Sequence, residues 1–134
     1  MANVRAMAIS SSPTKIQQCM KLGAFDSLNY KQIPDYSERV MLMSDHEGMD
    51  YIFDPVCAGA FFTTNLNCLG MDSKWVIYGT IGGTKVRELN MMKLLAKRAS
   101  ILTTNLRDKP NDQVARVIKD VENVVVPEIE NGKI

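Results

Sequence analysis

The sequence is poor in the residues that build disulfide frameworks and metal sites. It has three cysteines and one histidine in 134 residues, and no two cysteines have the spacing Cys-x-x-Cys. An odd number of cysteines without that spacing argues against both a disulfide framework and a structural zinc site. We therefore expect free thiols, a reducing compartment and no metal ligands. His46 lies in a polar segment, residues 44–48, and we interpret it as a loop residue.

Long apolar runs and an excess of charge of one sign are also absent. No apolar run approaches the roughly 20 residues that a membrane helix needs, and the formal net charge is +1. The first nine residues carry one arginine and a short apolar run, which is too weak for a signal peptide. We expect a cytoplasmic protein that binds neither nucleic acid nor a membrane.

Three short apolar runs rich in Ile, Val, Tyr and Thr dominate the middle of the chain, at residues 51–56, 74–79 and 100–105. Helix-length segments separate them, which is the spacing of parallel strands joined by crossover helices. In open parallel sheets, ligands bind at the carboxyl ends of the strands. Those ends carry the candidate site residues Asp54, Gly79, Thr80, Thr104 and Asn105.

The other segments continue the alternation of strands and helices. Ser12 is a good N-cap and Pro13 suits the first position of a helix. We predict strands at 4–9 and 27–30, a helix capped by Asp35 or Ser37, helices at 58–69, 89–97 and 110–125, and a turn at 70–73. The order predicts an α/β domain with a Rossmann-like, mostly parallel sheet flanked by helices. No strand leads into Gly-x-Gly-x-x-Gly, so the first strand of such a fold and its glycine-rich turn are missing.

The loop after the strand at 4–9 contains hydroxyl groups and a cation. Ser10, Ser11 and Ser12 follow one another, Lys15 lies about one helical turn later, and no acidic residue occurs before Asp26. Enzymes that use NAD place an acidic residue at such a strand end, whereas hydroxyls with a cation suit a phosphate group. From these residues alone, we favour Ser12 as a plain helix cap and Lys15 as a solvated residue over a phosphate pocket.

Several segments resemble a known enzyme family. Residues 11–15 (SSPTK), 21–24 (KLGA) and 28–31 (LNYK) resemble the second half of the cofactor domain of medium-chain dehydrogenases/reductases. The similarity is to the zinc-independent quinone oxidoreductases related to zeta-crystallin. Residues 65–79 and 93–103 look most like the tumour-suppressor-inducible branch. The resemblance implies that residues 1–134 are part of a dinucleotide-binding domain and that the catalytic domain is absent. Cys57-Ala58 stands where the family has Gly-Gly.

The resemblance also implies a cofactor, a substrate class and a partner. The cofactor is NADPH, the substrate is a quinone or related enone, and a homodimer forms through the strand at 100–105. Hydride transfer belongs to the cofactor, so we assign no catalytic residue. The positions that resemble the 2′-phosphate pocket and the adenosine and nicotinamide contacts are Ser10, Ser11, Lys15, Tyr30, Asp54, Val56, Gly79, Thr80, Thr104 and Asn105.

Two other functions stay open at this point. The first alternative is a truncated, non-catalytic fragment that dimerises or binds a partner. The second is part of an enoyl-thioester reductase of the same superfamily. On the leading interpretation, we expect the chain by itself to be catalytically inactive.

Overall fold

The computed structural model describes residues 4–133 of the chain. These residues form two compact units, which divide after Thr104. Among the described residues, no helix is long and apolar enough to cross a membrane.

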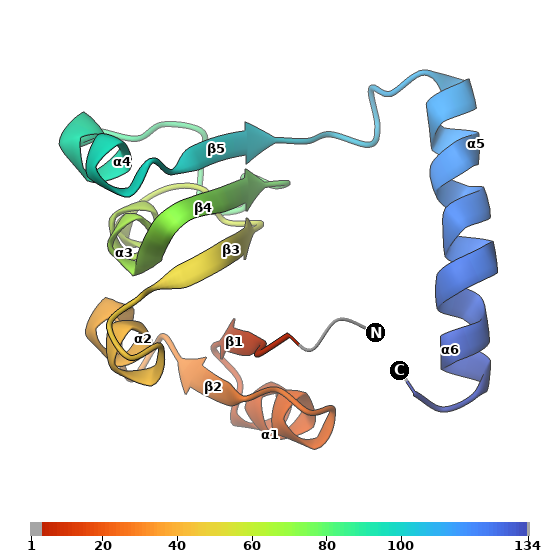
Figure 1. The fold of residues 1–134 in the computed structure, drawn as a ribbon, viewed down its shortest axis with the longest axis horizontal. Helices are drawn as coiled ribbons and strands as arrows, with labels where there is room; N and C mark the ends of the chain where they lie inside the picture. Colours follow the sequence, from red (N-terminus) through yellow and green to blue (C-terminus); the bar gives the residue numbers. More distant parts are fainter. Residues whose placement is uncertain (1–3, 134) are drawn as a thin grey trace. The chain divides into compact units, whose positions relative to one another are not determined.

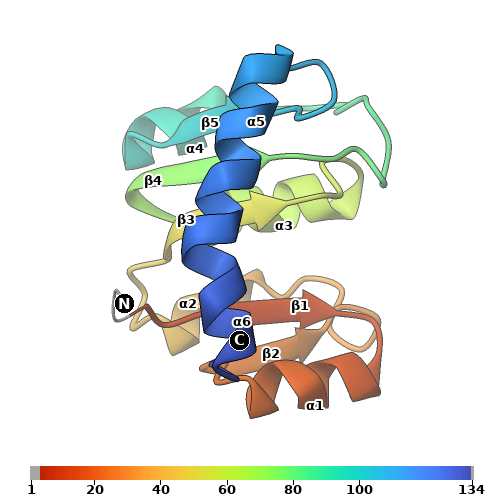
Figure 2. The same ribbon diagram turned by 90° about the vertical axis from the view of Figure 1, so that its right-hand side faces the viewer.

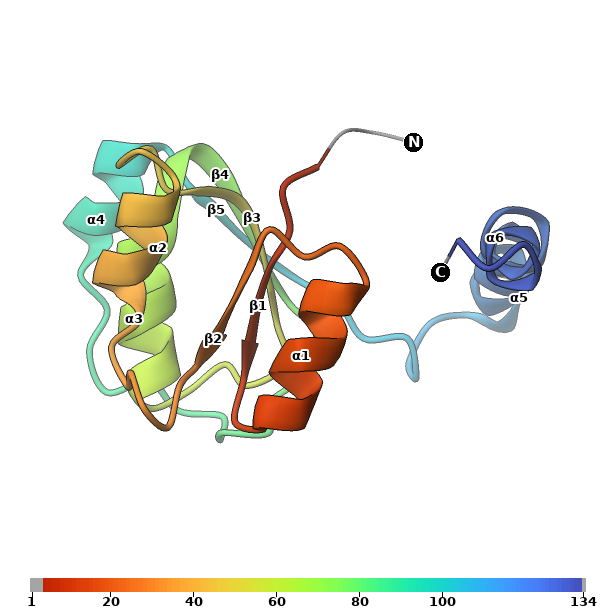
Figure 3. The same ribbon diagram turned by 90° about the horizontal axis from the view of Figure 1, so that it is seen from below.

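The first unit alternates strands and helices, and all of its strand pairs are parallel (Figure 1). A two-stranded sheet has the order β1-β2 and a three-stranded sheet has the order β3-β4-β5. Helices α2, α3 and α4 lie on one face of the strands and α1 on the other (Figure 3). The predicted α/β class with a Rossmann-like parallel arrangement is therefore confirmed. The elements are β1 (Met7–Ser10), α1 (Pro13–Lys21), β2 (Asp26–Asn29), α2 (Ser37–Met43), β3 (Met49–Asp54), α3 (Ala60–Cys68), β4 (Leu69–Ile77), α4 (Met91–Lys97) and β5 (Ser100–Thr103).

Local chemistry fixes the ends of the helices. The Ser12 hydroxyl accepts from the Lys15 backbone N–H and Pro13 opens α1, as predicted. Gly23, at φ +93°, follows the end of the same helix. Asp35 accepts hydrogen bonds from the N–H and the hydroxyl of Ser37. These bonds lower the pKa of the Asp35 carboxyl, the hydroxyl bond most strongly. The N-cap of α2 is Tyr36 and makes no side-chain cap hydrogen bond, so the predicted cap at Asp35 or Ser37 is wrong by one residue.

Two apolar clusters hold the first unit together. One contains Phe62, Leu66, Leu69, Trp75 and Leu94 and joins α3 and α4 to the three-stranded sheet. The other joins both sheets to α2 and α3, and its buried members are Leu28, Tyr36, Val40 and Cys68.

The predicted turn at 70–73 is wrong, because β4 begins at Leu69 and runs through this segment. Met49 pairs with Leu69 and Tyr51 pairs with Lys74, so the register shifts within the segment, and Asp72 takes a φ of +56° there. Gly48 lies so close that a Cβ on it would be 2.7 Å from the Gly70 nitrogen. The turn-forming residues therefore make a bulge inside a strand.

The second unit is helical. It contains α5 (Asn111–Asp120), a π-helical turn η1 (Val121–Val125) and α6 (Val126–Glu130). The predicted helix at 110–125 is present and extends five residues further, to Glu130. Its apolar side chains Val117, Ile118 and Val121 are exposed.

Candidate functional site

The serine loop lies where β1 passes into α1. The Ser12 N–H approaches the Ser10 hydroxyl at 3.4 Å, and the Ser12 hydroxyl accepts from the Lys15 N–H at 3.4 Å. Lys15 is exposed in the first turn of α1, a turn that has no acidic residue. The loop therefore presents hydroxyls and one cation at the positive end of a helix.

Tyr30 lies beside this loop. Its backbone N–H donates to the Ser10 carbonyl at 3.1 Å, because β1 and β2 end side by side. Its ring packs edge-on against Phe61, with centroids 4.8 Å apart. Asp26 lies at the other end of the strand pair, opposite Met7. Asp26 is the first acidic residue after the serine loop in the sequence. Because it lies level with Met7, it is about three residues, or roughly 10 Å, from Ser10 along the direction of the strands.

The ends of the three-stranded sheet bring most of the other predicted residues together. The Tyr78 N–H donates to the Asp54 carbonyl, the Gly82 N–H donates to the Val56 carbonyl, and the Thr104 N–H donates to the Ile77 carbonyl. A Cβ on Gly79 would lie 2.7 Å from the Pro55 carbonyl oxygen, so glycine is required there by close approach of the backbone. The sheet end thus gathers Asp54, Val56, Gly79, Thr80 and Thr104. Asn105 belongs to the second unit, so it is not placed with them.

The Asp54 side chain is tied into the fold. It is 2% exposed, and one carboxylate oxygen accepts from the backbone N–H groups of Val56 and Cys57 at 2.7 and 3.0 Å. The other oxygen accepts from the Asn65 amide at 3.0 Å and from the Trp75 indole at 3.1 Å. The Asp54 carboxylate therefore anchors the end of β3 and the loop after it through hydrogen bonds within the protein.

Sequence reasoning missed the extension of this network to Tyr36. The Tyr36 hydroxyl donates to the Asn65 side-chain oxygen at 2.6 Å. Burial is the main cause that raises the pKa of Tyr36 well above its ordinary value. Burial likewise raises the pKa of the neighbouring Cys68 thiol to about 12. Asn65 and Tyr36 lie in helical or loop segments far from Asp54 in sequence, so no local pattern signals their contact.

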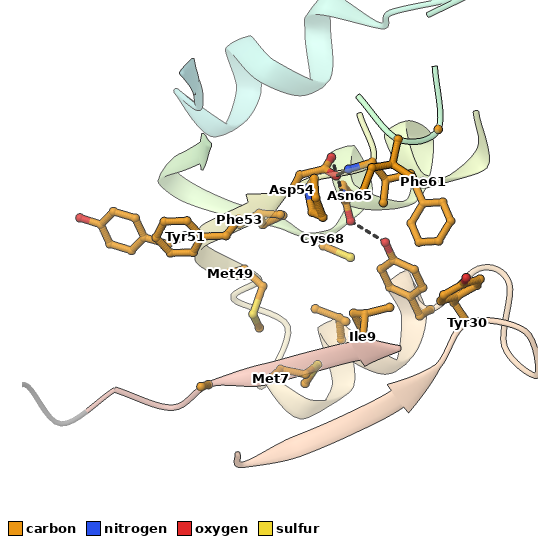
Figure 4. Close-up of a pocket in the computed structure, with 18 of the residues that line it drawn as sticks. Met7, Ile9, Tyr30, Met49, Tyr51, Phe53, Asp54, Phe61, Asn65 and Cys68 are labelled. Atoms are coloured by element: carbon orange, nitrogen blue, oxygen red, sulfur yellow. Dashed lines mark hydrogen bonds between the residues drawn. The ribbon is translucent and has the colours of Figure 1, made fainter. Parts of the chain in front are cut away.

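A pocket of about 460 Å³ lies between β1 and β3 (Figure 4). Its walls are mainly apolar. Of the predicted site residues, Tyr30, Asp54 and Val56 line it, whereas the serine loop and Lys15 lie outside it. The predicted residues therefore fall into two groups within the first unit, one at the end of the two-stranded sheet and one at the end of the three-stranded sheet.

Comparison with known proteins identifies relatives for almost the whole chain. The family described as zinc-binding dehydrogenase matches residues 1–123. A search of curated proteins found no match.

Solved structures show the same fold at low sequence identity. A quinone oxidoreductase from Pseudomonas syringae pv. Tomato is 21% identical with a TM-score of 0.72, over 96% of this chain and 38% of that one. An NAD-dependent alcohol dehydrogenase is 21% identical with a TM-score of 0.74, over 97% of this chain and 34% of that one. An alcohol dehydrogenase from the archaeon Aeropyrum pernix is 17% identical with a TM-score of 0.71, over 100% of this chain and 42% of that one.

The chain thus spans well under half the length of each of these three proteins. The family match covers most of the 134 residues, and the parallel strands with flanking helices agree with it. The chain belongs to the zinc-binding dehydrogenase family.

Proposed function

We propose that this chain is the NADPH-binding part of an oxidoreductase that reduces quinones or related enones. One observation carries the choice of cofactor: the loop after β1 joins serine hydroxyls and an exposed lysine to the first turn of α1, without an acidic residue. An anion at that position gains from the hydroxyl donors, the lysine charge and the helix dipole. A 2′-phosphate supplies such an anion, whereas the free 2′-hydroxyl of NADH is better served by a carboxylate.

The residues present fit this group. Ser10, Ser11 and Lys15 would hold the phosphate, and Tyr30 would close the pocket from the end of β2. Asp26, the nearest acidic residue after the loop, lies at the opposite end of the strand pair and beside Arg39, whose guanidinium is 3.7 Å from it. No carboxylate from β2 therefore repels a phosphate at the serine loop.

The remaining predicted residues suit the rest of a nicotinamide dinucleotide. The sheet end at Val56, Gly79, Thr80 and Thr104 presents backbone groups and small side chains, which allow close approach of a ligand. This sheet end, with the backbone of Asp54, would then serve the adenosine and nicotinamide side. When bound, the cofactor supplies the hydride, and this chain binds and orients it.

The family's description implies zinc, and the described residues do not fit a zinc site. Residues 4–133 contain no group of three or more His, Cys, Asp or Glu side chains placed to hold a metal ion. Cys19 lies in α1, Cys57 follows β3 and Cys68 ends α3. The proposal therefore involves no zinc bound by this part of the chain.

The substrate class is supported by similarity alone. The sequence resembles quinone oxidoreductases, and the Pseudomonas syringae protein is one of the structurally similar proteins that carry that name. Because this chain covers 38% of that protein, the reaction is proposed for the whole protein that contains the chain.

The experiment is a binding titration with adenosine 2′,5′-bisphosphate, NADPH and NADH against the wild-type protein and two variants. Lys15→Ala should weaken binding of NADPH and of the bisphosphate at least tenfold, because a charged hydrogen bond is worth about 1.5–3 kcal/mol. NADH binding should not change, because NADH offers Lys15 no phosphate. Lys21→Ala, which removes the basic residue in the last turn of the same helix, is the matched control and should leave all three constants unchanged.

The outcomes separate the alternatives. Equal losses for NADPH and NADH would make Lys15 a structural residue, and unchanged constants in Lys15→Ala would make it a solvated one. Absence of binding to any dinucleotide would favour the non-catalytic interpretation.

We further propose a homodimer through β5. This strand is at the edge of the three-stranded sheet, and Leu102 on it is 45% exposed. Unpaired edges with apolar side chains favour strand pairing across a two-fold axis. Sedimentation at micromolar concentration should show a dimer, and a monomer at every concentration would contradict it.

A further inference from the structure

A chain of buried hydrogen bonds leads from α2 to the loop after β3. The Tyr36 hydroxyl donates to the Asn65 side-chain oxygen at 2.6 Å, and the Asn65 amide donates to one oxygen of the Asp54 carboxylate at 3.0 Å. The other carboxylate oxygen accepts the backbone N–H groups of Val56 and Cys57. We call Tyr36, Asn65 and Asp54 the buried network, because all three residues are shielded from water.

The buried network joins elements that are distant in the sequence. Tyr36 is the N-cap of α2, Asn65 lies in α3 and Asp54 ends β3. The two helices lie on the same face of the strands (Figure 2 and Figure 3), so both side chains reach the strand end from the helices. Neither side-chain bond belongs to a helix or a strand ladder. The network therefore fixes the end of β3 in addition to the pairing of the sheet.

The loop after β3 has a conformation that its own sequence disfavours. Cys57 lies at φ +70°, where an L-residue has an unfavourable contact between its Cβ and the backbone. The N–H of this residue is one of the two that the Asp54 carboxylate accepts. The carboxylate therefore stabilises a backbone conformation that the loop would not favour alone.

The loop after β4 is packed on the loop after β3. The Ile81 N–H donates to the Pro55 carbonyl at 3.0 Å, and the Gly82 N–H donates to the Val56 carbonyl at 2.9 Å. A Cβ on Gly82 would lie 2.6 Å from a methyl carbon of Val56, so the two loops are in close contact. A shift of the loop after β3 would therefore move the loop after β4 as well.

We propose that Tyr36 and Asn65 are positioning residues for the candidate cofactor site. They orient the Asp54 carboxylate, the carboxylate holds the loop after β3, and that loop holds the loop after β4. Val56 in the first loop and Thr80 in the second are among the proposed contacts of the dinucleotide. The inference rests on the proposed function for the identity of the ligand, whereas the coupling of the two loops does not depend on it.

The chemistry of the network favours this role over simple packing. An amide can accept from a hydroxyl and donate to a carboxylate at the same time, so Asn65 fixes the direction of both bonds. Bonds to a charged acceptor are stronger than those between neutral groups, and the Asp54 carboxylate is the acceptor at the end of the chain. Apolar side chains could fill the same space, but they would leave the orientation of the carboxylate undetermined.

Amide hydrogen exchange followed by NMR tests the positioning role without any ligand. Asn65→Leu keeps the approximate size of the side chain and removes both of its hydrogen bonds. The reporters are the loop amides of Val56, Cys57, Ile81 and Gly82, compared with the amides of β4, the middle strand of its sheet. The loop amides should exchange at least tenfold faster relative to those of β4, because the loss of a bond to a charged acceptor opens the loops locally.

Two further variants locate the effect. Asn67→Leu is the matched control, because Asn67 lies in the same helix and its side-chain oxygen accepts from Lys93. It should leave exchange of the loop amides unchanged. Tyr36→Phe removes one hydroxyl and should accelerate the loop amides by about threefold or more. It should add nothing in the Asn65→Leu background, because the hydroxyl acts through the amide. If Asn65→Leu does not fold by circular dichroism, Tyr36→Phe and the control carry the test.

Titration with NADPH and NADH connects the loops to the ligand. Asn65→Leu should weaken both dinucleotides by the same factor, at least about threefold, because the loops serve parts that the two cofactors share. Lys15→Ala should instead weaken NADPH alone and leave exchange of the loop amides unchanged. Asn67→Leu should change neither affinity.

The outcomes separate this inference from the proposed function. Equal acceleration of loop and β4 amides would overturn the positioning role, since it would show a loss of global stability only. Additive effects of Tyr36→Phe and Asn65→Leu would also overturn it. Selective loop acceleration with unchanged dinucleotide affinities would overturn the link to the cofactor site. If the wild-type protein binds neither dinucleotide, the proposed function fails, and the exchange comparison still decides whether Tyr36 and Asn65 position the loops.

Discussion

The indole N–H of Trp75 donates to the carboxylate of Asp54 at 3.1 Å. Both side chains are almost fully shielded from water, at 0% and 2% exposure, and they come from the adjacent strands β4 and β3. The same carboxylate also holds the turn after β3 and the amide of Asn65. One side chain therefore ties two strands, one helix and one loop together.

Removal of this carboxylate should be costly. Asp54→Ala leaves the Trp75 indole and the Asn65 amide without their acceptor, and each buried group left unpaired costs about 1–3 kcal/mol. We expect the free energy of unfolding to fall by about 3 kcal/mol or more in urea denaturation followed by circular dichroism. Asp50→Ala, an exposed aspartate on the same strand, is the matched control and should change stability by less than about 0.5 kcal/mol. A similar small effect in both variants would show that the network contributes little.

Cys57 occupies a conformation that favours glycine. Its φ is +70°, which costs an L-residue roughly 1–2 kcal/mol. Cys57→Gly removes that strain. Glycine also raises the conformational entropy of the unfolded chain, which lowers the free energy of unfolding by about 0.4–1 kcal/mol. We expect the variant to be as stable as the wild type or up to about 1 kcal/mol more stable. The resemblance noted above expects glycine at this same position.

Cys19→Gly provides the comparison for Cys57→Gly. Cys19 lies inside α1, where glycine is about 1 kcal/mol less favourable than alanine. Thermal unfolding should therefore rank Cys57→Gly above Cys19→Gly. If both variants lose the same stability, backbone strain at Cys57 does not contribute significantly to the stability of the protein.

Alkaline pH should destabilise the fold through Cys68. Burial raises the pKa of this thiol from 9.0 to about 12, so the folded chain keeps the proton where the unfolded chain loses it. The stabilisation is complete below pH 9 and is lost as pH rises toward 12. Between pH 9 and pH 10, linkage predicts a loss of about 1 kcal/mol from this thiol.

The matching variant is Cys68→Ala. It should lower stability at pH 7, because it leaves a cavity, and it should also flatten the decline between pH 9 and pH 10. Tyr36 has a raised pKa as well, from a higher starting value, so its contribution enters above pH 10. An unchanged slope in Cys68→Ala would assign the alkaline loss to other groups.

The parts of the fold that local chemistry determines were predictable from the sequence. Ser12-Pro13 defined the start of α1, because caps depend on residues within one turn. The parallel class followed from the spacing of apolar runs. The turn prediction at 70–73 failed because pairing of β4 with β3, which is non-local, overrode the turn propensity of Gly70 and Asp72.

The candidate site was predictable only in outline. Strand ends identified Asp54 and Gly79 as residues at one edge of the sheet. Their actual contacts depend on tertiary structure: Asp54 is bonded to residues 11 and 21 positions away, and Gly79 is required by the nearby Pro55 backbone. The pocket between β1 and β3 could not be located from periodicity, because apolar alternation does not reveal which strands lie side by side.

The position of Trp75 also gives the protein an intrinsic optical reporter. It is the single tryptophan, and it lies in the middle strand of the three-stranded sheet, so its emission reports that sheet and not the β1-β2 pair. Circular dichroism, by contrast, averages over every helix and strand. Denaturation curves from the two signals will coincide if both sheets unfold as one cooperative unit, and will separate if the β1-β2 pair melts independently.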